Sequence, residues 1–330
     1  MRCGVSFGGI ATYNSMVRST SKIPKKDRFR GCLLGLAVGD AIGAPFEGLT
    51  AETIYRDFGP VGPLIANLDA EVISYTDDTQ MAIGLTECLL QSNSIGADHL
   101  ADCFCKNYEA SRGYGAGMRK ILDAMVEGRD WQTLVQSLFP GGSFGNGAAM
   151  RVAPVGLAFH HDLERLRDQA AQSARVTHLH PLAVDAAIIV AAAISILLHQ
   201  DEFNSKAFFN QLAETATTEE FQWQLRTAGR LDPKEMLSFG STLAAHRSVT
   251  TAITCFTVWP DSYEKAIGRA ITMGEDTDTL AAIAGALSGA YLGVSAIPAN
   301  WLSKLENGPK GRDYIDRIAT ELYAKSCESL

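Results

Sequence analysis

The sequence predicts an all-α fold, a compact orthogonal array of many helices, and three observations support it. Hairpin dipeptides between alternating apolar and polar runs are missing from the 330 residues, as is any βαβ rhythm. Segments with the apolar spacing of a helix recur instead along the chain. The segment 281–290 carries small residues on every face, which allows close helix–helix packing at the centre of a bundle.

In the first half of the chain, helix-start signals precede apolar residues at helical spacing. Asp27 provides an acidic residue at the start of the first apolar run. In the second run, Met81, Leu85 and Cys88 lie on one helix face. Helices are therefore expected at 27–38, 79–91, 98–110, 117–126, 131–138, 148–159 and 163–176.

The second half continues the helical pattern to the end of the chain. Its longest apolar run, 181–198, is shorter than a typical membrane span and contains Asp185, so it is predicted to be a buried core helix. In the last segment, Ile315, Ile318 and Leu322 share one face. The expected helices are 182–199, 206–214, 241–258, 263–273, 279–291, 298–305 and 311–324.

The composition is that of a globular enzyme. Hydrophobic residues make up 46% of the chain and charged residues 20%, which excludes a disordered chain. The formal net charge of −8 argues against non-specific binding to nucleic acid. We expect one all-α domain over residues 27–330. Residues 1–26 are expected to be an N-terminal extension that is either disordered or binds a partner.

The cysteines predict a reduced protein in the cytoplasm. They are odd in number and scattered, and several lie in apolar runs, where a free thiol behaves as a small hydrophobic group. Cys103 and Cys105 have no second thiol or histidine pair at zinc-site spacing. The segment 1–26 has its basic residues in the wrong order for a secretory signal. The cysteines are Cys3, Cys32, Cys88, Cys103, Cys105, Cys255 and Cys327.

Two acidic motifs carry the main functional signal. The segments 76–79 (Thr-Asp-Asp-Thr) and 276–279 (Asp-Thr-Asp-Thr) each open a predicted helix. Each motif alone could simply cap its helix, because Asp and Thr are favoured N-caps. Two near-copies favour a shared site, because carboxylate and hydroxyl oxygens are ligands for Mg²⁺ or Mn²⁺ and clustered carboxylates repel one another without a cation. We therefore expect a binuclear metal centre within the helical array.

Two glycine-rich loops, 113–117 and 141–147, each precede a predicted helix. Glycines at a helix N-terminus let backbone amides approach a phosphate closely. Neither loop matches the dinucleotide fingerprint or the nucleotide-binding P-loop, and each alone could be an ordinary turn. Beside a predicted metal site, they favour a nucleotide-like ligand with a diphosphate.

The motifs in their order strongly resemble the ADP-ribosylglycohydrolase family, with a match from about Phe29 to Trp301. The resemblance implies an all-α fold, a binuclear Mg²⁺ or Mn²⁺ centre and removal of ADP-ribose from a modified side chain. One departure is Glu275, which follows Gly274 where the family usually has Gly-Gly; its side chain could point outward or alter the surroundings of the metal. The segments that carry the resemblance are 35–47, 75–81, 112–117, 145–151, 177–178, 274–279 and 297–301.

The resemblance also assigns roles to individual residues. Glu47 takes the position of an acidic residue that reaches the metal in serine-linkage relatives, and Glu47 or Asp77 is the expected general base. The implied metal ligands are Thr76, Asp77, Asp78, Asp276, Asp278 and Thr279. The implied ADP-ribose contacts are Gly115, Gly117, Ser143, Phe144, Gly145, Asn146, Gly147 and His178.

Cleavage at ribose passes through an oxocarbenium-like state, which carboxylates and metal ions stabilise. The expected substrate is an ADP-ribosylated protein, with the arginine N-linkage favoured over the serine O-linkage. The segment 239–247 lies where the family places a loop on the substrate side. An alternative is an immunity protein that also neutralises an ADP-ribosylating toxin by stoichiometric contact through residues 1–26. Neither nucleic acid nor a membrane is an expected partner.

Overall fold

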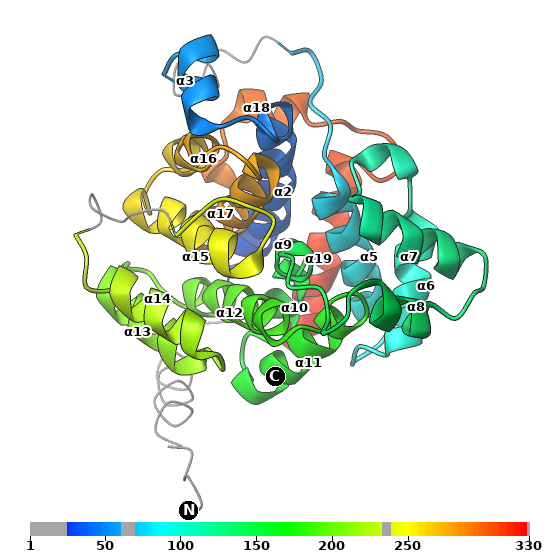
Figure 1. Ribbon diagram of the computed structural model, residues 1–330. Helices are drawn as coiled ribbons and strands as arrows, with labels where there is room; N and C mark the ends of the chain where they lie inside the picture. Colours follow the sequence, from blue (N-terminus) through cyan, green and yellow to red (C-terminus); the bar gives the residue numbers. More distant parts are fainter. Residues whose placement is uncertain (1–24, 61–69, 233–238, 329–330) are drawn as a thin grey trace, which may run out of the picture.

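The protein is described by a computed structural model over residues 25–60, 70–232 and 239–328 (Figure 1). Within these ranges the regular elements are helices, and the strand-like pairing consists of three isolated backbone bridges. The all-α prediction is confirmed. Most of the predicted N-terminal extension lies outside the described residues, and the first described helix begins at Lys26.

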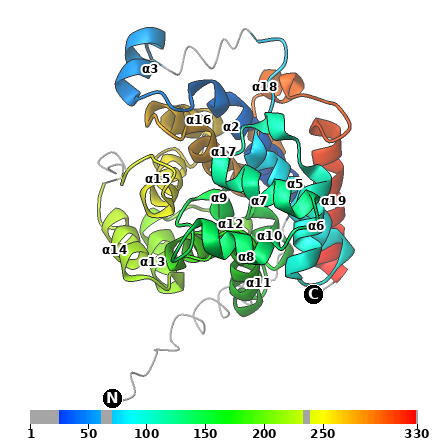
Figure 2. The ribbon, with the colours of Figure 1, turned by 45° about the vertical axis from the view of Figure 1, so that its right-hand side comes forward.

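Figures 1 and 2 show how the helices are arranged in space. In the first half they are α2 (Lys26–Gly43), η1 (Ala44–Phe46), α3 (Ala51–Phe58), α5 (Asp77–Gln91), α6 (Ala97–Asn107), η2 (Ala110–Arg112), α7 (Ala116–Val126), α8 (Trp131–Leu138), α9 (Gly147–Met150), α10 (Ala153–Ala158) and α11 (Leu163–Arg175). In the second half they are α12 (Pro181–Leu198), α13 (Ser205–Thr215), α14 (Glu219–Ala228), α15 (Ala245–Val258), α16 (Tyr263–Thr272), α17 (Thr277–Leu292), η4 (Val294–Ala296), α18 (Ala299–Lys304) and α19 (Arg312–Glu328).

Helices α2 and α17 form the centre of the array and pack antiparallel along a row of small residues. A Cβ atom added to Gly35 would lie 2.5 Å from the carbonyl oxygen of Gly285, so only glycine fits there. This close approach confirms the expectation drawn from the small residues of 281–290. The facing pairs are Gly31 with Gly289, Gly35 with Gly285, Gly39 with Ala281, and Gly43 with Thr277.

The glycine row fixes where the functional groups lie. Because the two helices are antiparallel, the C-terminal end of α2 meets the N-terminal end of α17, and the Thr277 hydroxyl donates a hydrogen bond to the carbonyl of Gly43 at 3.0 Å. Helix α5 also packs against both α2 and α17. The two acidic motifs are therefore brought to one end of the central pair.

Helix α12 is the second core element. It packs against α9, α10, α11 and α15, and its side chains are almost all buried. By length and composition, α12 and the segment 26–46 could each cross a membrane, but most of each is buried inside the structure. The prediction of a core helix at 181–198 agrees with this burial.

Two helix predictions need correction, and two helices were not predicted. The single helix expected at 148–159 is two short helices, α9 and α10, because Arg151 and Val152 separate them and Pro154 starts the second. The helix expected from residue 241 begins at Ala245. Helices α3 and α14 were missed because charged and polar residues dilute their apolar spacing. None of these differences changes the helical architecture.

Candidate active site

A cavity of about 600 Å³ lies where the acidic motifs and the glycine-rich loops meet. Its volume is within the range of small-molecule sites. The cavity is lined by every predicted site residue except Thr76. Those residues are Glu47, Asp77, Asp78, Gly115, Gly117, Ser143, Phe144, Gly145, Asn146, Gly147, His178, Asp276, Asp278 and Thr279.

The acidic wall is built from two helix N-termini and the loop after η1. Thr76 caps α5, its hydroxyl accepting from the Asp78 amide, so Asp77 and Asp78 fall in the first helical turn. Asp276 is the N-cap residue of α17, and Asp278 follows in its first turn. Oxygen atoms of Glu47, Asp276 and Asp278 all lie within 4.8 Å of one another. Because Asp77 and Asp78 line the same cavity as Asp276 and Asp278, the two motifs share one site.

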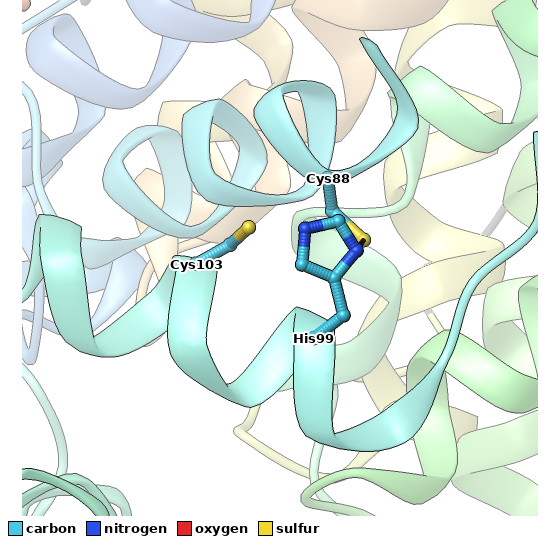
Figure 3. Close-up of side chains that lie close together, drawn as sticks. All are labelled: Cys88, His99 and Cys103. Carbon is cyan, nitrogen blue, oxygen red and sulfur yellow. Dashed lines mark hydrogen bonds between the residues drawn. The ribbon is translucent and has the colours of Figure 1, made fainter. Parts of the chain in front are cut away.

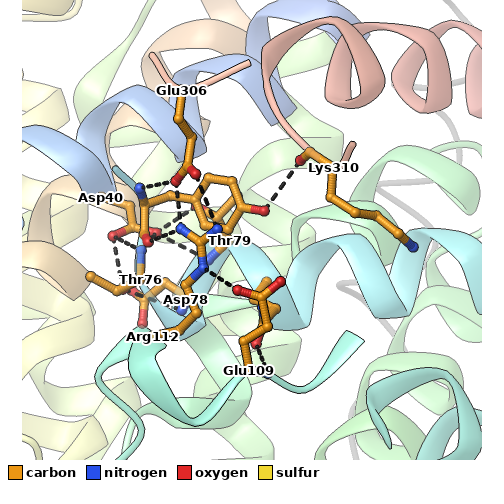
Figure 4. Close-up of polar contacts among 10 residues, drawn as sticks. Asp40, Thr76, Asp78, Thr79, Glu109, Arg112, Glu306 and Lys310 are labelled. Carbon is orange, nitrogen blue, oxygen red and sulfur yellow. Dashed lines mark hydrogen bonds and ion pairs between the residues drawn. The ribbon is translucent and has the colours of Figure 1, made fainter. Parts of the chain in front are cut away.

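Asp40 of α2 is a residue of this site to which the sequence analysis gave no role. Its carboxylate is fully buried and accepts hydrogen bonds from the amide and hydroxyl of Thr76, at 3.0 and 2.8 Å, and from those of Thr79, at 3.1 and 2.5 Å (Figure 4). Asp40 thus holds Thr76, which caps α5. Thr76 itself does not line the cavity. The sequence signal for the role of Asp40 is an aspartate inside an otherwise apolar helix, because an unpaired charge buried there costs folding free energy.

A second network fixes the chain just before the first motif. Arg112 donates to the carbonyl of Tyr75 at 2.9 Å and pairs with Glu306, while Glu306 accepts from the amide of Tyr75 at 3.0 Å. The guanidinium of Arg112 also lies over the Tyr75 ring, 4.1 Å from its centroid. These contacts, drawn in Figure 4, tie the start of α5 to the loop after α18. Arg112 and Glu306 therefore position the acidic motif.

The clustered carboxylates perturb one another's protonation. Burial, with the charges of Asp40 and Asp278, raises the pKa of Asp77 to about 8. Burial and Asp278 raise the pKa of Asp40 to about 7. Burial, again with neighbouring carboxylates, holds the pKa values of Asp78 and Asp276 well above the usual range. A cation would remove this repulsion and return the groups to the charged form.

The chemistry of the donor set fits a hard divalent cation. One oxygen of Asp78, Oδ2, is buried and has no hydrogen-bond partner. Among the described lysines and arginines, none forms an ion pair with the carboxylates of the acidic wall. Buried carboxylate oxygens from two helix N-termini, one of them without a hydrogen-bond partner, are ligands suited to Mg²⁺ or Mn²⁺.

Glycine-rich loops form the opposite wall. A Cβ atom on Gly117 would lie 2.6 Å from the ring of Phe139, and one on Gly147 would lie 2.9 Å from the ring of His178. Glycine at these two positions lets the rings pack against the backbone, whereas at Gly115, just before α7, the space beside the backbone is open to a ligand. Phe144 is 52% exposed at this wall, which leaves its ring free to cover a ligand.

Asn146 connects the loop wall to the acidic wall. Its amide nitrogen donates to the carboxylate of Asp276 and, at 3.0 Å, to the hydroxyl of Ser248. This contact orients Asp276, so the side chain of Asn146 serves the acidic wall, although the resemblance implied that it contacts ADP-ribose.

His178 presents a neutral ring to the cavity. Burial and the charge of Arg151 lower the pKa of His178 to about 3. The Thr177 hydroxyl accepts from Arg151 at 2.8 Å and lies 2.7 Å from Nδ1 of His178. No other acceptor for this hydroxyl is found in the described part of the chain, so its proton goes to Nδ1. Nε2 of His178 therefore carries a proton and can donate to a ligand oxygen.

Glu275 points away from the main cavity. It adopts a left-handed backbone with a φ of 63°, next to Gly274 at 71°, and its side chain is exposed. It lines a second, adjoining hollow of about 450 Å³ together with Glu47, Gly48, Phe144, Thr242, Leu243, Ala244 and Asp276. Of the two alternatives for this departure from the family pattern, the structure shows the outward one.

A family model described as ADP-ribosylglycohydrolase matches residues 21–329. The chain belongs to the ADP-ribosylglycohydrolase family. The match is longer at both ends than the range expected from the motifs and begins inside the segment assigned to the extension.

Relatives in animals and bacteria agree with this placement. The chain is 32% identical to ADP-ribosylhydrolase ARH3 of Bos taurus, over 92% of this chain and 94% of the relative. It is also 32% identical to ADP-ribosylhydrolase ARH3 of Homo sapiens, over 90% and 93%. ADP-ribosylarginine hydrolase Tri1 of Pseudomonas putida is 26% identical, over 91% of this chain and 79% of the relative.

A solved structure described as "ADP-ribosylglycohydrolase-related protein complex" has the same fold. Its TM-score is 0.71 at 28% sequence identity, and the match covers 91% of this chain and 98% of the solved one. The family, and with it an ADP-ribose hydrolase activity, rests on these comparisons and on the preserved order of motifs.

Proposed function

We propose that this chain removes ADP-ribose from modified protein side chains in a reaction that needs two divalent cations, Mg²⁺ or Mn²⁺. The observation that carries the proposal is the convergence of the two acidic motifs and Glu47 at one end of a cavity large enough for a nucleotide. The proposed ligands are Thr76, Asp77, Asp78, Asp276, Asp278 and Thr279. Of these, Thr76 is the weakest candidate, because its hydroxyl is already engaged with Asp40.

The glycine loops and His178 are proposed to bind the ADP-ribose. Backbone amides at the start of α7 and α9 are suited to the diphosphate. His178 donates from Nε2, and Phe144 covers a ring of the ligand by stacking. The ribose is proposed to lie toward the acidic wall, because the glycine loops and the acidic residues line the same cavity.

The acidic wall is proposed to hold and deprotonate the attacking water. The cations, when bound, orient the ribose hydroxyls and make a water more acidic. Glu47 or Asp77 accepts the proton from that water as its oxygen bonds to C1 of the ribose and the glycosidic bond to the modified side chain breaks; the released side chain takes up that proton. The negative charge of the remaining carboxylates stabilises the oxocarbenium-like state at C1. Asp40 and Asn146 keep the acidic groups in position.

The proposal also concerns the bond that joins ADP-ribose to the modified side chain. The sequence analysis favours arginine, and the Pseudomonas putida relative carries arginine in its name. One observation supports a second candidate, serine: Glu47 lies against Asp276 and Asp278, as the resemblance implies for serine-linkage relatives. The hollow lined by Glu47, Leu243 and Glu275 is the proposed site for the modified side chain.

The test is release of labelled ADP-ribose from arginine-modified and serine-modified protein, with Mg²⁺, with Mn²⁺ and with a chelator. Release from either substrate, lost in the chelator and in Asp77→Ala with an unchanged helical spectrum, is expected. A wild-type protein that releases nothing from both substrates, or Asp77→Ala with full activity, would contradict the proposal. The rate ratio of the two substrates assigns the linkage.

The toxin-binding alternative depends on residues 1–26, of which 1–24 lie outside the described residues, and no comparison supports it. The cytoplasmic location also stays a prediction.

A further inference from the structure

Three potential metal ligands meet between α5 and α6, away from the acidic wall. Cys88 comes from α5, and His99 and Cys103 come from successive turns of α6 (Figure 3). Their sulfur and nitrogen atoms all lie within 4.8 Å of one another. The cluster was not predicted from the sequence, because Cys88 comes from a different helix than His99 and Cys103.

The distances are close to those of a tetrahedral zinc site. Bond lengths of about 2.3 Å to sulfur and about 2.0 Å to nitrogen place a sulfur and a nitrogen ligand about 3.6 Å apart at the tetrahedral angle. Sγ of Cys88 and Nδ1 of His99 are 3.6 Å apart. The two sulfur atoms lie within 4.8 Å of each other. Little movement is needed to bind an ion.

The histidine is already oriented for a metal. Nε2 of His99 lies 3.0 Å from Oε1 of Gln91, which can only accept a hydrogen bond. Nε2 therefore carries the proton, and Nδ1, which lies 3.6 Å from Sγ of Cys88, keeps its lone pair for a metal ion. A hydrogen bond to the outer nitrogen of a ligating histidine is the usual support of a metal site.

The surroundings suit an ion that enters from solvent. Both thiols are buried, whereas His99 is only partly buried and offers a route inward. Cys88 lies eleven residues along α5 from Asp77, which corresponds to about 16 Å of helix, so this site is separate from the acidic wall. Soft thiolate and imidazole ligands favour Zn²⁺ over Mg²⁺.

We propose that Cys88, His99 and Cys103 bind one Zn²⁺ ion, with a water in the fourth position. Binding forms two zinc–sulfur bonds and one zinc–nitrogen bond and releases the two thiol protons to solvent. The ion ties α5 to α6 and so stabilises the helix that carries Asp77 and Asp78.

The experiment uses Co²⁺ as the probe, on the full chain after reduction and removal of bound metal without oxygen. A thiolate-to-cobalt charge-transfer band that saturates at one equivalent is expected, and added Zn²⁺ should abolish it. The acidic wall contributes no such band, because it has no thiolate. Zn²⁺ affinity then follows from competition with a coloured chelator.

Variants test each ligand. Cys88→Ser and Cys103→Ser should each weaken Zn²⁺ binding at least about a hundredfold, and Gln91→Ala about tenfold. Cys105→Ser is the matched control, since Cys105 lies on the same helix outside the cluster, and it should keep the band. His99→Ala, at a partly exposed position, tests the site without a new buried cavity. Zn²⁺ should raise the melting temperature of the wild type and not of Cys103→Ser.

Absence of the band in reduced wild-type protein would overturn the proposal, whether or not mass spectrometry finds a Cys88–Cys103 disulfide. A band that persists in Cys103→Ser would also overturn it. Circular dichroism of each variant confirms that the helices are retained before binding is measured.

Discussion

Two buried aspartates on different helices differ in how their carboxylates are hydrogen-bonded. Asp185 of α12 is fully buried, and its carboxylate accepts hydrogen bonds from the amides of Thr217 and Thr218, at 2.9 and 2.8 Å, and from the Thr218 hydroxyl at 2.6 Å. Asp78 of α5 is equally buried, but its Oδ2 has no partner and the nearest charges are other carboxylates. The carboxylate of Asp185 therefore has its hydrogen-bond donors, whereas that of Asp78 has an oxygen without one.

This difference distinguishes a buried charge that supports the fold from a buried charge that serves a binding site. A buried carboxylate with enough donors stabilises the fold by joining two segments, here α12 and the start of α14. A buried carboxylate without donors costs folding free energy, and such a cost is typical of sites that bind something. Asp40 lies between the two kinds: Thr76 and Thr79 donate hydrogen bonds to its carboxylate, but burial and the charge of Asp278 still raise its pKa to about 7.

The largest expected effect is on activity, at Asp78. Asp78→Asn should reduce ADP-ribose release at least about a hundredfold at saturating Mg²⁺, because a metal ligand loses its charge. Its metal-free melting temperature should stay the same or rise, since one repelling charge is removed. Steady-state rates and thermal unfolding in chelator measure both. A variant with unchanged rates would show that Asp78 is not a metal ligand.

Asp185 should behave in the reverse way. Asp185→Ala leaves two amides and a hydroxyl without an acceptor, so the free energy of unfolding should fall by about 3 kcal/mol. Denaturant titration measures the loss, with Asp102→Ala, at an exposed aspartate of α6, as a control that should change it by less than about 0.5 kcal/mol. The rate per folded molecule should be unaffected. A small loss of stability together with a large loss of activity would break the distinction drawn above.

Metal binding should stabilise the acidic wall. At a Mg²⁺ concentration of about one hundred times the dissociation constant, linkage adds about 2.7 kcal/mol to the free energy of unfolding. The melting temperature of the wild type should therefore rise with Mg²⁺ or Mn²⁺, and that of Asp278→Asn should rise much less. Equal shifts in the two proteins would place the stabilising ion elsewhere.

The pH dependence of the metal-free protein tests the repulsion directly. The folded-state pKa values of Asp40 and Asp77 are raised to about 7 and about 8 from an ordinary value of 3.8, so the folded protein binds more protons than the unfolded one. The contribution of these groups to stability is therefore complete below pH 3.8 and is lost as the pH rises through 7 and 8. Melting curves in chelator should show this decline, and saturating Mg²⁺ should reduce it. If the stability of the metal-free protein does not change across this pH range, the proposed repulsion between these carboxylates in the folded protein is wrong.

The smallest effect is expected at Glu275. A residue other than glycine in the left-handed region costs about 1 kcal/mol, so Glu275→Gly should stabilise the protein by up to about that amount. Because the side chain lines the hollow beside Glu47, the same variant should change the KM for modified protein more than the kcat. Glu275→Gln keeps the backbone strain and isolates the effect of the charge.

The sequence was enough for the helical class and for most of the cavity, because both depend on local patterns and on ordered motifs. It did not reveal Asp40, since a single aspartate within an apolar helix does not show which segment will satisfy it. It also did not reveal the cluster of Cys88, His99 and Cys103, whose members meet only when α6 packs against α5. In both cases the residues meet through contacts between helices, and the spacing of residues along the chain does not reveal these contacts.

The glycine row between α2 and α17 has a consequence for how such a protein can diversify. Because these helices meet backbone to backbone, the separation between Asp40 and Asp278 is set by main-chain atoms and not by the sizes of core side chains. Core substitutions elsewhere can therefore accumulate without altering the distances between the carboxylates. The loops at 141–147 and 239–244 lie outside this pair, so new acceptor side chains can be accommodated there while the reaction centre keeps its dimensions.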